Sequence, residues 1–146
     1  MNRSELVLAV LAAGNGGAYT PVQVQKLFFL IDKKLSDHTG GPFFNFIPYD
    51  YGPFDKEVYR AIEALSESGE AEIIRNPCVG LKEYRLTTAG QKKGEQILRS
   101  LDLDNSDFIK RLSEFVRSLS FAELVSAIYK AYPEMKVNSV FKENKA

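Results

Sequence analysis

Few residues in this sequence have the types and the spacing that catalysis or metal binding requires. His38 is the only histidine and Cys78 the only cysteine, and they lie far apart in the chain. A metal centre or an acid–base pair needs further partners nearby, and a nucleophilic thiol needs a base beside it. The sequence contains no lysine-bearing phosphate loop, zinc-protease motif or nucleophile elbow. We therefore predict that the protein is not an enzyme and holds no metal and no cofactor.

The cations in the second half of the chain do suggest a chemistry, because they outnumber the acids there. Between Ile73 and Leu103 there are six basic and three acidic residues, a net charge of +3. Lysine and arginine side chains near the start of a helix can hold phosphate groups. We predict contacts with the backbone of double-stranded DNA at Arg75, Lys82, Arg85, Lys92 and Lys93. The alternative is that these cations pair with acids on a solvated surface.

The segment before them has the opposite charge. Asp55–Glu72 contains two basic and six acidic residues, a net charge of −4. Negative charge near phosphates opposes the release of counterions that drives DNA binding. Lys56, Tyr59 and Arg60 nevertheless cluster in the first turns of a predicted helix, and we predict that these three approach the bases. The alternative is a helix face exposed to solvent.

An aromatic cluster surrounds the Gly52-Pro53 pair, where we expect a turn. Its members are Tyr49, Tyr51, Phe54 and Tyr59. Aromatic side chains on a rigid turn are good anchors for a protein interface. They can equally close the core over the preceding helix. Both interpretations remain open at the level of the sequence, with the structural role favoured.

Composition describes a chain that can bury a core without help. The chain has 146 residues, 45% of them hydrophobic, with 19 basic and 19 acidic residues. A net charge of zero argues against a domain built mainly for nucleic acid or membranes. A single cysteine fits a reducing compartment. We expect a cytoplasmic, bacterial protein without a membrane span, whose N-terminal apolar run is a core helix and not a signal peptide.

Capping residues and apolar spacing predict the elements. Helices are expected at Glu5–Ala13 with Ser4 as cap, from Thr20-Pro21 to about Ser36–Gly41, at Lys56–Ser68 with Asp55 as cap, and from Thr87 or Thr88 to about Leu101. An extended segment is expected at Phe43–Tyr49, and strands at Glu70–Arg75 and Lys82–Leu86. A polar break at Asp102–Ser106 should precede two helices with apolar stripes, the first with Phe108, Leu112, Phe115, Val116 and Leu119, the second with Phe121, Leu124, Val125, Ile128 and Tyr132.

The order helix, hairpin, helix is typical of the second half of a winged helix. We therefore predict an α+β fold that is mostly α. Residues 1–101 should form a winged-helix-like core of three helices and a two-stranded wing. Residues 102–146 should form a C-terminal helical extension that packs on this core or on a second subunit, which would make the protein a homodimer.

Two motifs resemble a known family. The run K-L-F-F-L-I-D at Lys26–Asp32 and the run Y-D-Y-G-P-F-D-K-E-V-Y at Tyr49–Tyr59 resemble segments of bacterial YwgA-like and Panacea-domain proteins, the latter including SocA-type antitoxins. The resemblance implies a helical, winged-helix-related module without known catalysis. Some members of the family act as antitoxins through protein contacts.

Two functions follow from these observations as hypotheses. The first is a non-enzymatic regulator with a winged-helix-like, DNA-binding or transcription-regulating role. The second is a protein-interaction module, antitoxin-like or an adaptor, that binds a partner such as a toxin through the Tyr49–Tyr59 surface. The acidic third helix favours the second function.

Overall fold

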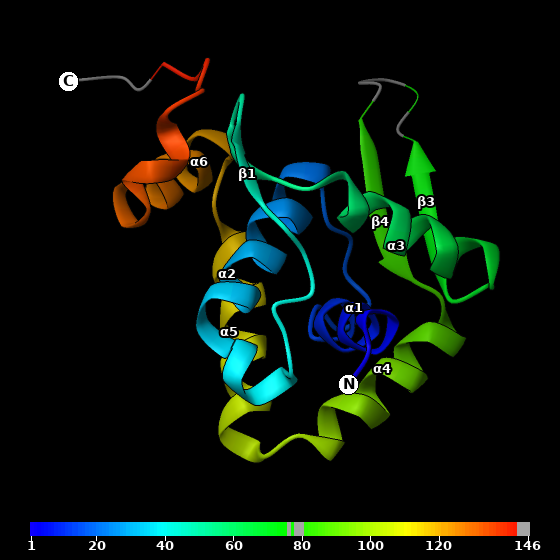
Figure 1. Cartoon of the computed structure of the whole chain (residues 1–146). Helices are drawn as coiled ribbons and strands as arrows, with labels where there is room; N and C mark the ends of the chain where they lie inside the picture. Colours follow the sequence, from blue (N-terminus) through cyan, green and yellow to red (C-terminus); the bar gives the residue numbers. More distant parts are fainter. Residues whose placement is uncertain (76, 78–80, 143–146) are drawn as a thin grey trace.

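The computed structural model describes residues 1–75, 77 and 81–142 (Figure 1). The predicted class, α+β and mostly helical, is confirmed. Cys78 lies outside the described residues. The elements are α1 (Arg3–Ala12), α2 (Pro21–Thr39), β1 (Ile47–Tyr49), β2 (Gly52–Phe54), α3 (Lys56–Glu67), β3 (Ala71–Arg75), β4 (Lys82–Leu86), α4 (Thr88–Ser100), α5 (Leu103–Ser118), α6 (Phe121–Ala131) and the short 3-10 helix η1 (Pro133–Lys136).

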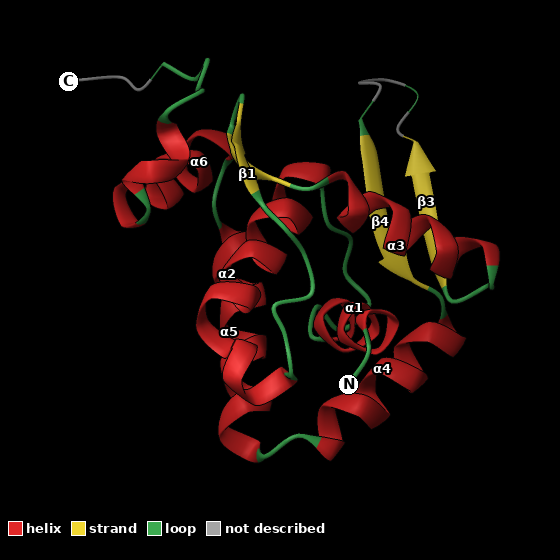
Figure 2. Ribbon diagram, in the orientation of Figure 1, coloured by secondary structure: helices red, strands yellow, loops and turns green. Residues whose placement is uncertain are grey.

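Helix α1 is the centre of the fold. Figure 2 shows it nearly end-on, with α2 and α5 on one side and α4 below it. Every residue from Leu6 to Ala12 is buried, as the apolar sequence predicts. The predicted cap at Ser4 is wrong: the helix begins after Asn2, whose side chain accepts a hydrogen bond from the Glu5 amide at 2.8 Å. Glu5 in turn accepts from the Asn2 amide, which completes a capping box that Ser4 could not form.

Helix α2 forms the second layer, and the C-terminal helices α5 and α6 pack against it. It begins after Thr20, which forms a capping box with Gln23, and it ends at Gly40 with a φ of +85°. Helix α5 packs along α2 in Figure 1, so the predicted extension covers this chain's own core. The predicted polar break is shorter than expected, because Asp102 caps α5 and the helix starts at Leu103.

Two of the predicted apolar stripes are only partly buried. Phe115 and Phe121 were both expected to be buried, and both are exposed. In α5 the buried face is turned toward Ile109 and Ser113, so that Phe115 points outward. Phe121 is the first residue of α6, and the buried face of that helix begins one turn later. The remaining stripe residues behave largely as predicted, since Leu112, Val116, Leu124, Val125 and Ile128 are buried.

Strands β1 and β2 form a tight hairpin between α2 and α3. Tyr49 pairs with Gly52, so the two-residue turn is Asp50-Tyr51. The predicted turn at Gly52-Pro53 is therefore wrong by two positions. Gly52 has a φ of +103°, a conformation that favours glycine. It is the first residue of β2 and follows the turn. Proline is tolerated there because a two-stranded ribbon leaves an edge without a hydrogen-bonding partner.

Strands β3 and β4 form the predicted second hairpin, with five antiparallel pairs. Tyr19 adds an isolated bridge on the other side of β4, through two backbone hydrogen bonds of 2.8 Å with Tyr84. Helix α3 lies over this hairpin and begins at the predicted cap Asp55. Thr87 caps α4, and its hydroxyl donates to the Gly69 carbonyl oxygen at 2.8 Å. The hairpin is thereby fixed at its base.

Candidate functional site

The exposed face of α3 does not present the predicted trio as a unit. Lys56 and Arg60 are exposed, but the Arg60 guanidinium pairs with the Glu57 carboxylate at 2.6 Å. Tyr59 is half-buried, with its ring 5.8 Å from the Phe54 ring and 6.1 Å from the Tyr84 ring. Burial raises the pKa of Tyr59. Farther along the same face Glu63 and Glu67 are exposed, so only its first turn is basic.

Two of the five cations predicted to contact phosphates form ion pairs with acidic residues. Arg85 lies opposite Glu72 in the strand register, and their side chains pair at 3.0 Å. Lys93 pairs with Glu70 at 3.2 Å. Arg85 and Lys93 thus have the surface pairing that was the alternative interpretation. Exposed pairs of this kind contribute little to stability, and phosphates can compete for such cations.

The remaining three phosphate-contact cations lie in two places. Arg75 and Lys82 face each other at the loop end of the β3–β4 hairpin, where β3 ends and β4 begins. Lys92 is exposed on α4, the helix that follows the other end of β4 (Figure 1). Four residue steps along β3 correspond to about 14 Å at a strand rise of about 3.4 Å per residue. The predicted set is therefore spread over two separate surfaces.

The aromatic cluster divides between the two roles considered for it. Phe54 and Tyr59 pack inward toward β4, which is the structural role. Tyr49 stacks on Phe54 at 4.9 Å yet remains 48% exposed. Tyr51 is also exposed, and its ring meets the Phe121 ring edge-on at 5.0 Å. The two tyrosines next to the turn are thus held in place by ring contacts and still face solvent.

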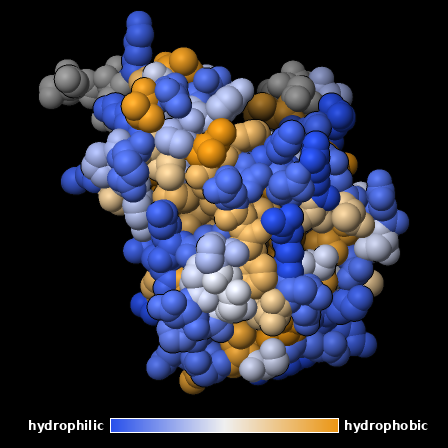
Figure 3. Space-filling model, viewed as in Figure 1, coloured by the Kyte–Doolittle hydropathy of each residue, from blue (hydrophilic) through white to orange (hydrophobic). Residues whose placement is uncertain are grey.

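The chain after η1 extends this exposed apolar region. The Val140 amide donates to the Asp50 carbonyl oxygen at 2.9 Å, and the Asn138 side chain donates to the Pro48 carbonyl oxygen at 3.2 Å. Figure 3 shows hydrophobic residues at the surface where the hairpin and the C-terminal segment lie. We call this region the hairpin surface and define it by its exposed large apolar residues: Ile47, Tyr49, Tyr51, Phe121, Val137 and Val140.

Sequence reasoning missed four of these six residues. Phe121 was assigned to a buried stripe, and Val137 and Val140 lie beyond the last predicted helix. Ile47 was treated as part of an extended segment with no role. No local signal identifies them, because the surface is assembled from segments about ninety positions apart. The adjacent tyrosines Tyr49 and Tyr51 were the only local indication.

Buried polar residues on α2 hold the hairpin in position. The Gln25 side chain both donates to and accepts from the Asp55 backbone, at 2.9 Å in each case. The Lys26 ammonium donates to the Pro53 carbonyl oxygen at 3.3 Å. The Asp32 carboxylate accepts from the Phe43 and Phe44 amides, although its burial raises its pKa. The route of the chain from α2 to α3 is therefore fixed by specific bonds.

Other classes of site find no support in the described part of the chain. Its histidine and acidic side chains do not form a group of three or more that could hold a metal ion. None of its helices combines the length and the apolar character that crossing a bilayer requires. Comparisons of the chain with protein-family models, with curated proteins and with solved structures find no match.

Proposed function

We propose that this protein is a non-enzymatic module that binds a partner protein through the hairpin surface. The observation that carries the proposal is the position of the exposed apolar side chains. Of the ten large apolar residues that are exposed in the described chain, six belong to the hairpin surface. They include two tyrosines and a phenylalanine held by ring contacts. Pre-positioned aromatic side chains bind well because little conformational freedom is lost on association.

The resemblance to Panacea-type proteins supports the same surface. The motif Tyr49–Tyr59 that carries the resemblance contains the whole turn of the hairpin. Some proteins of that family act as antitoxins through protein contacts, so a toxin is one kind of partner to expect. The partner should present an apolar groove that accepts the rings of Tyr49 and Tyr51.

A matched pair of variants tests this proposal. Tyr49→Ser combined with Tyr51→Ser removes the two exposed rings, while Phe115→Ser removes an equally exposed ring (47% against 48% for Tyr49) on α5. Tagged wild type and both variants are used to isolate partners from the source cells by quantitative mass spectrometry. Each candidate is then titrated against the purified proteins. A partner that binds wild type and Phe115→Ser but loses at least about tenfold affinity for the double variant supports the proposal.

The result that overturns it is equally direct. If every partner that binds the purified wild type binds the double variant with the same affinity, the hairpin surface is not the interface. Amide spectra of the variants establish that the fold is retained.

A second candidate function is binding of DNA through the loop end of the β3–β4 hairpin, where Arg75 and Lys82 lie. Like charges placed directly opposite in a ribbon are destabilising, yet Arg75 and Lys82 form such a pair. The order α1, Tyr19, α2, α3, β3, β4 supports a winged-helix-like core into which β1 and β2 are inserted. Titration of mixed duplex DNA at low and near-physiological salt tests this candidate, and the absence of binding even at low salt rejects it.

A further inference from the structure

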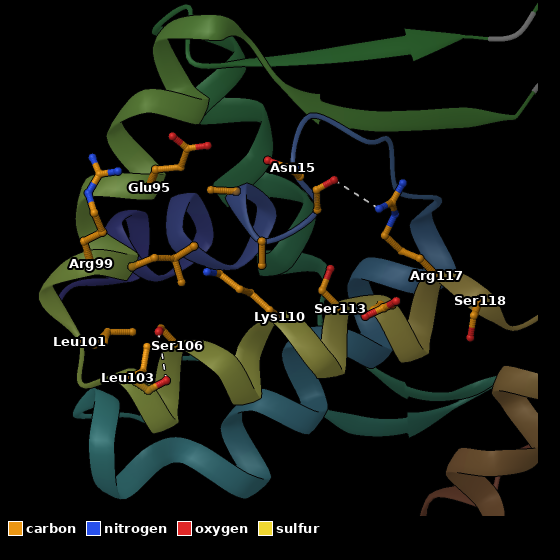
Figure 4. Close-up of a pocket in the computed structure, with 15 residues that line it drawn as sticks. Asn15, Glu95, Arg99, Leu101, Leu103, Ser106, Lys110, Ser113, Arg117 and Ser118 are labelled. Atoms are coloured by element: carbon orange, nitrogen blue, oxygen red, sulfur yellow. Dashed lines mark hydrogen bonds between the residues drawn. The ribbon is translucent and has the colours of Figure 1, made fainter.

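A cleft that shares no residue with the hairpin surface lies between the end of α1, α4 and α5 (Figure 4). Its volume is about 1180 Å³, large enough for a small organic molecule. Leu98 and Leu101 line it from the α4 side, and Ala12 and Ala13 from α1. The cleft therefore has an apolar wall.

The α5 side of the cleft is mostly polar, including at its buried positions. Ser106 and Ser113 lie on the same helical face and are only 6% and 1% exposed. The Ser113 and Tyr19 hydroxyls form a hydrogen bond with each other. Ser113 lines the cleft and Tyr19 does not, so the Ser113 hydroxyl is the member of the pair that a bound molecule can meet.

Three cations line the same cleft. Arg99, Lys110 and Arg117 line the cleft together with Glu95 and Glu114, which gives a net charge of +1. Within the described chain none of the three cations forms an ion pair, although two carboxylates lie in the same lining. Figure 4 shows the Lys110 side chain extending into the space between the helices. These cations are therefore available to a bound anion.

Arg117 is held at the edge of the cleft, next to Gly14. Its guanidinium donates to the Gly14 carbonyl oxygen at 3.3 Å and lies 5.2 Å from the centre of the Tyr19 ring. A Cβ atom at Gly17 would lie 2.0 Å from the same guanidinium. The absence of a side chain at Gly17 therefore leaves room for the guanidinium. The arginine is held by a carbonyl group and a ring, neither of which neutralises its charge.

We infer that this cleft binds a small monocarboxylate with an apolar body. The carboxylate lies beside Lys110 and Ser113, and the apolar body lies against Leu98, Leu101 and Ala12. Hydrogen bonds from cations to a carboxylate are among the stronger ones available to a protein. A net charge of +1 suits a monoanion, because Glu95 and Glu114 repel a phosphate dianion. The site is independent of the partner surface proposed above.

The test uses three eight-carbon probes on isotopically labelled full-length protein. Octanoate, octanol and octyl phosphate have the same apolar body and differ in charge. We expect octanoate to shift the amides of residues 12–17 and 106–118, and to bind at least about tenfold more tightly than octanol. Equal binding of octanol, tighter binding of octyl phosphate, or shifts confined to other residues would each overturn the inference. So would the absence of octanoate binding.

A matched pair of lysine variants tests whether the charge of Lys110 contributes to octanoate binding. Lys110→Met keeps the length of the side chain and removes its charge at the cleft, and Lys34→Met does the same at an exposed position of α2. Octanoate affinity should fall about tenfold in Lys110→Met and stay unchanged in Lys34→Met. Unchanged affinity in Lys110→Met contradicts the assignment. Octanol binding should be the same in both variants, since the apolar wall is intact.

Discussion

The Lys26 ammonium lies beneath the β1–β2 hairpin and donates to the Pro53 carbonyl oxygen, 3.3 Å away. Lys26 is only 3% exposed, and its other two N–H groups have no acceptor among the described residues. A buried charge with one neutral partner is costly. Burial accordingly lowers the pKa of Lys26 to about 8, from an ordinary value of 10.5. The hairpin is therefore held in part by a lysine whose burial opposes its charge.

Replacing this lysine should stabilise the protein. We expect Lys26→Met to raise the free energy of unfolding by up to about 3 kcal/mol near neutral pH, from about 1.4 kcal/mol per pKa unit. Loss of the bond to the Pro53 carbonyl oxygen offsets part of this gain. Urea denaturation of wild type, Lys26→Met and the exposed-site control Lys34→Met measures the difference. A lower stability for Lys26→Met than for Lys34→Met would contradict it.

The stability of the wild type should also depend on pH in a defined window. Below about pH 8 Lys26 is charged in both states, and the folded state bears the full cost of burial. Between about 8 and 10.5 the unfolded chain binds more protons than the folded chain, so this lysine's contribution to the free energy of unfolding rises with pH. The advantage of Lys26→Met should shrink across that window. An advantage independent of pH would mean that packing, not charge, causes it.

Gly52 should tolerate substitution less well than another glycine of similar backbone conformation. Its φ is +103°, and an added Cβ would lie 3.3 Å from Tyr129 Cε1. Gly40 has a φ of +85° with nothing within 4 Å of such a Cβ. We expect Gly40→Ala to cost about 1 kcal/mol through the backbone alone, and Gly52→Ala about 2 kcal/mol or more. Chemical denaturation compares the two variants, and equal costs would contradict the contact with Tyr129.

The like-charge pair at the end of the β3–β4 hairpin should be destabilising. Lys82→Glu places a carboxylate opposite Arg75, and we expect it to raise the free energy of unfolding by about 0.2–1 kcal/mol. The gain should diminish in high salt, because both side chains are at the surface. Thermal unfolding at low and high salt measures it. If Lys82→Glu destabilises the protein at low salt, the two charges do not repel each other in the folded state.

Charge reversals at the two ends of this hairpin distinguish the DNA contacts. If the second candidate function holds, Arg75→Glu with Lys82→Glu should weaken binding to mixed duplex DNA and flatten its salt dependence. Lys92→Glu with Lys93→Glu tests the α4 end by the same measurement. Reversals that leave affinity unchanged at one end remove that end from the contact surface.

Local signals predicted those parts of the fold that depend on neighbouring residues. Thr20, Asp55 and Thr87 were found as caps because each satisfies amides within its own first turn. The first helix was misplaced by two residues because Asn2 and Ser4 are both competent caps. The glutamate three positions after Asn2 decides between them, and this pattern was present in the sequence.

Exposure of the C-terminal aromatic residues could not be predicted in this way. Apolar spacing in α5 permits a face centred on Phe115 or one centred on Val116, and contact with α2 selects the second. The same selection buries Ser113, which no hydrophobic pattern would place in a core. The cleft and most of the hairpin surface depend on how the helices pack against one another, so neither was predicted as a unit.

The burial of α1 on all sides has a consequence for the order in which the protein can fold. The helices that pack against α1 are α3, α4 and α5, and all of them follow it in the chain. Tyr19 likewise forms its backbone bridge with Tyr84, which lies 65 positions later in the chain. Contacts of such long sequence separation slow folding and leave apolar surface exposed during synthesis. The helix at the centre of the fold is made before every element that shields it from water.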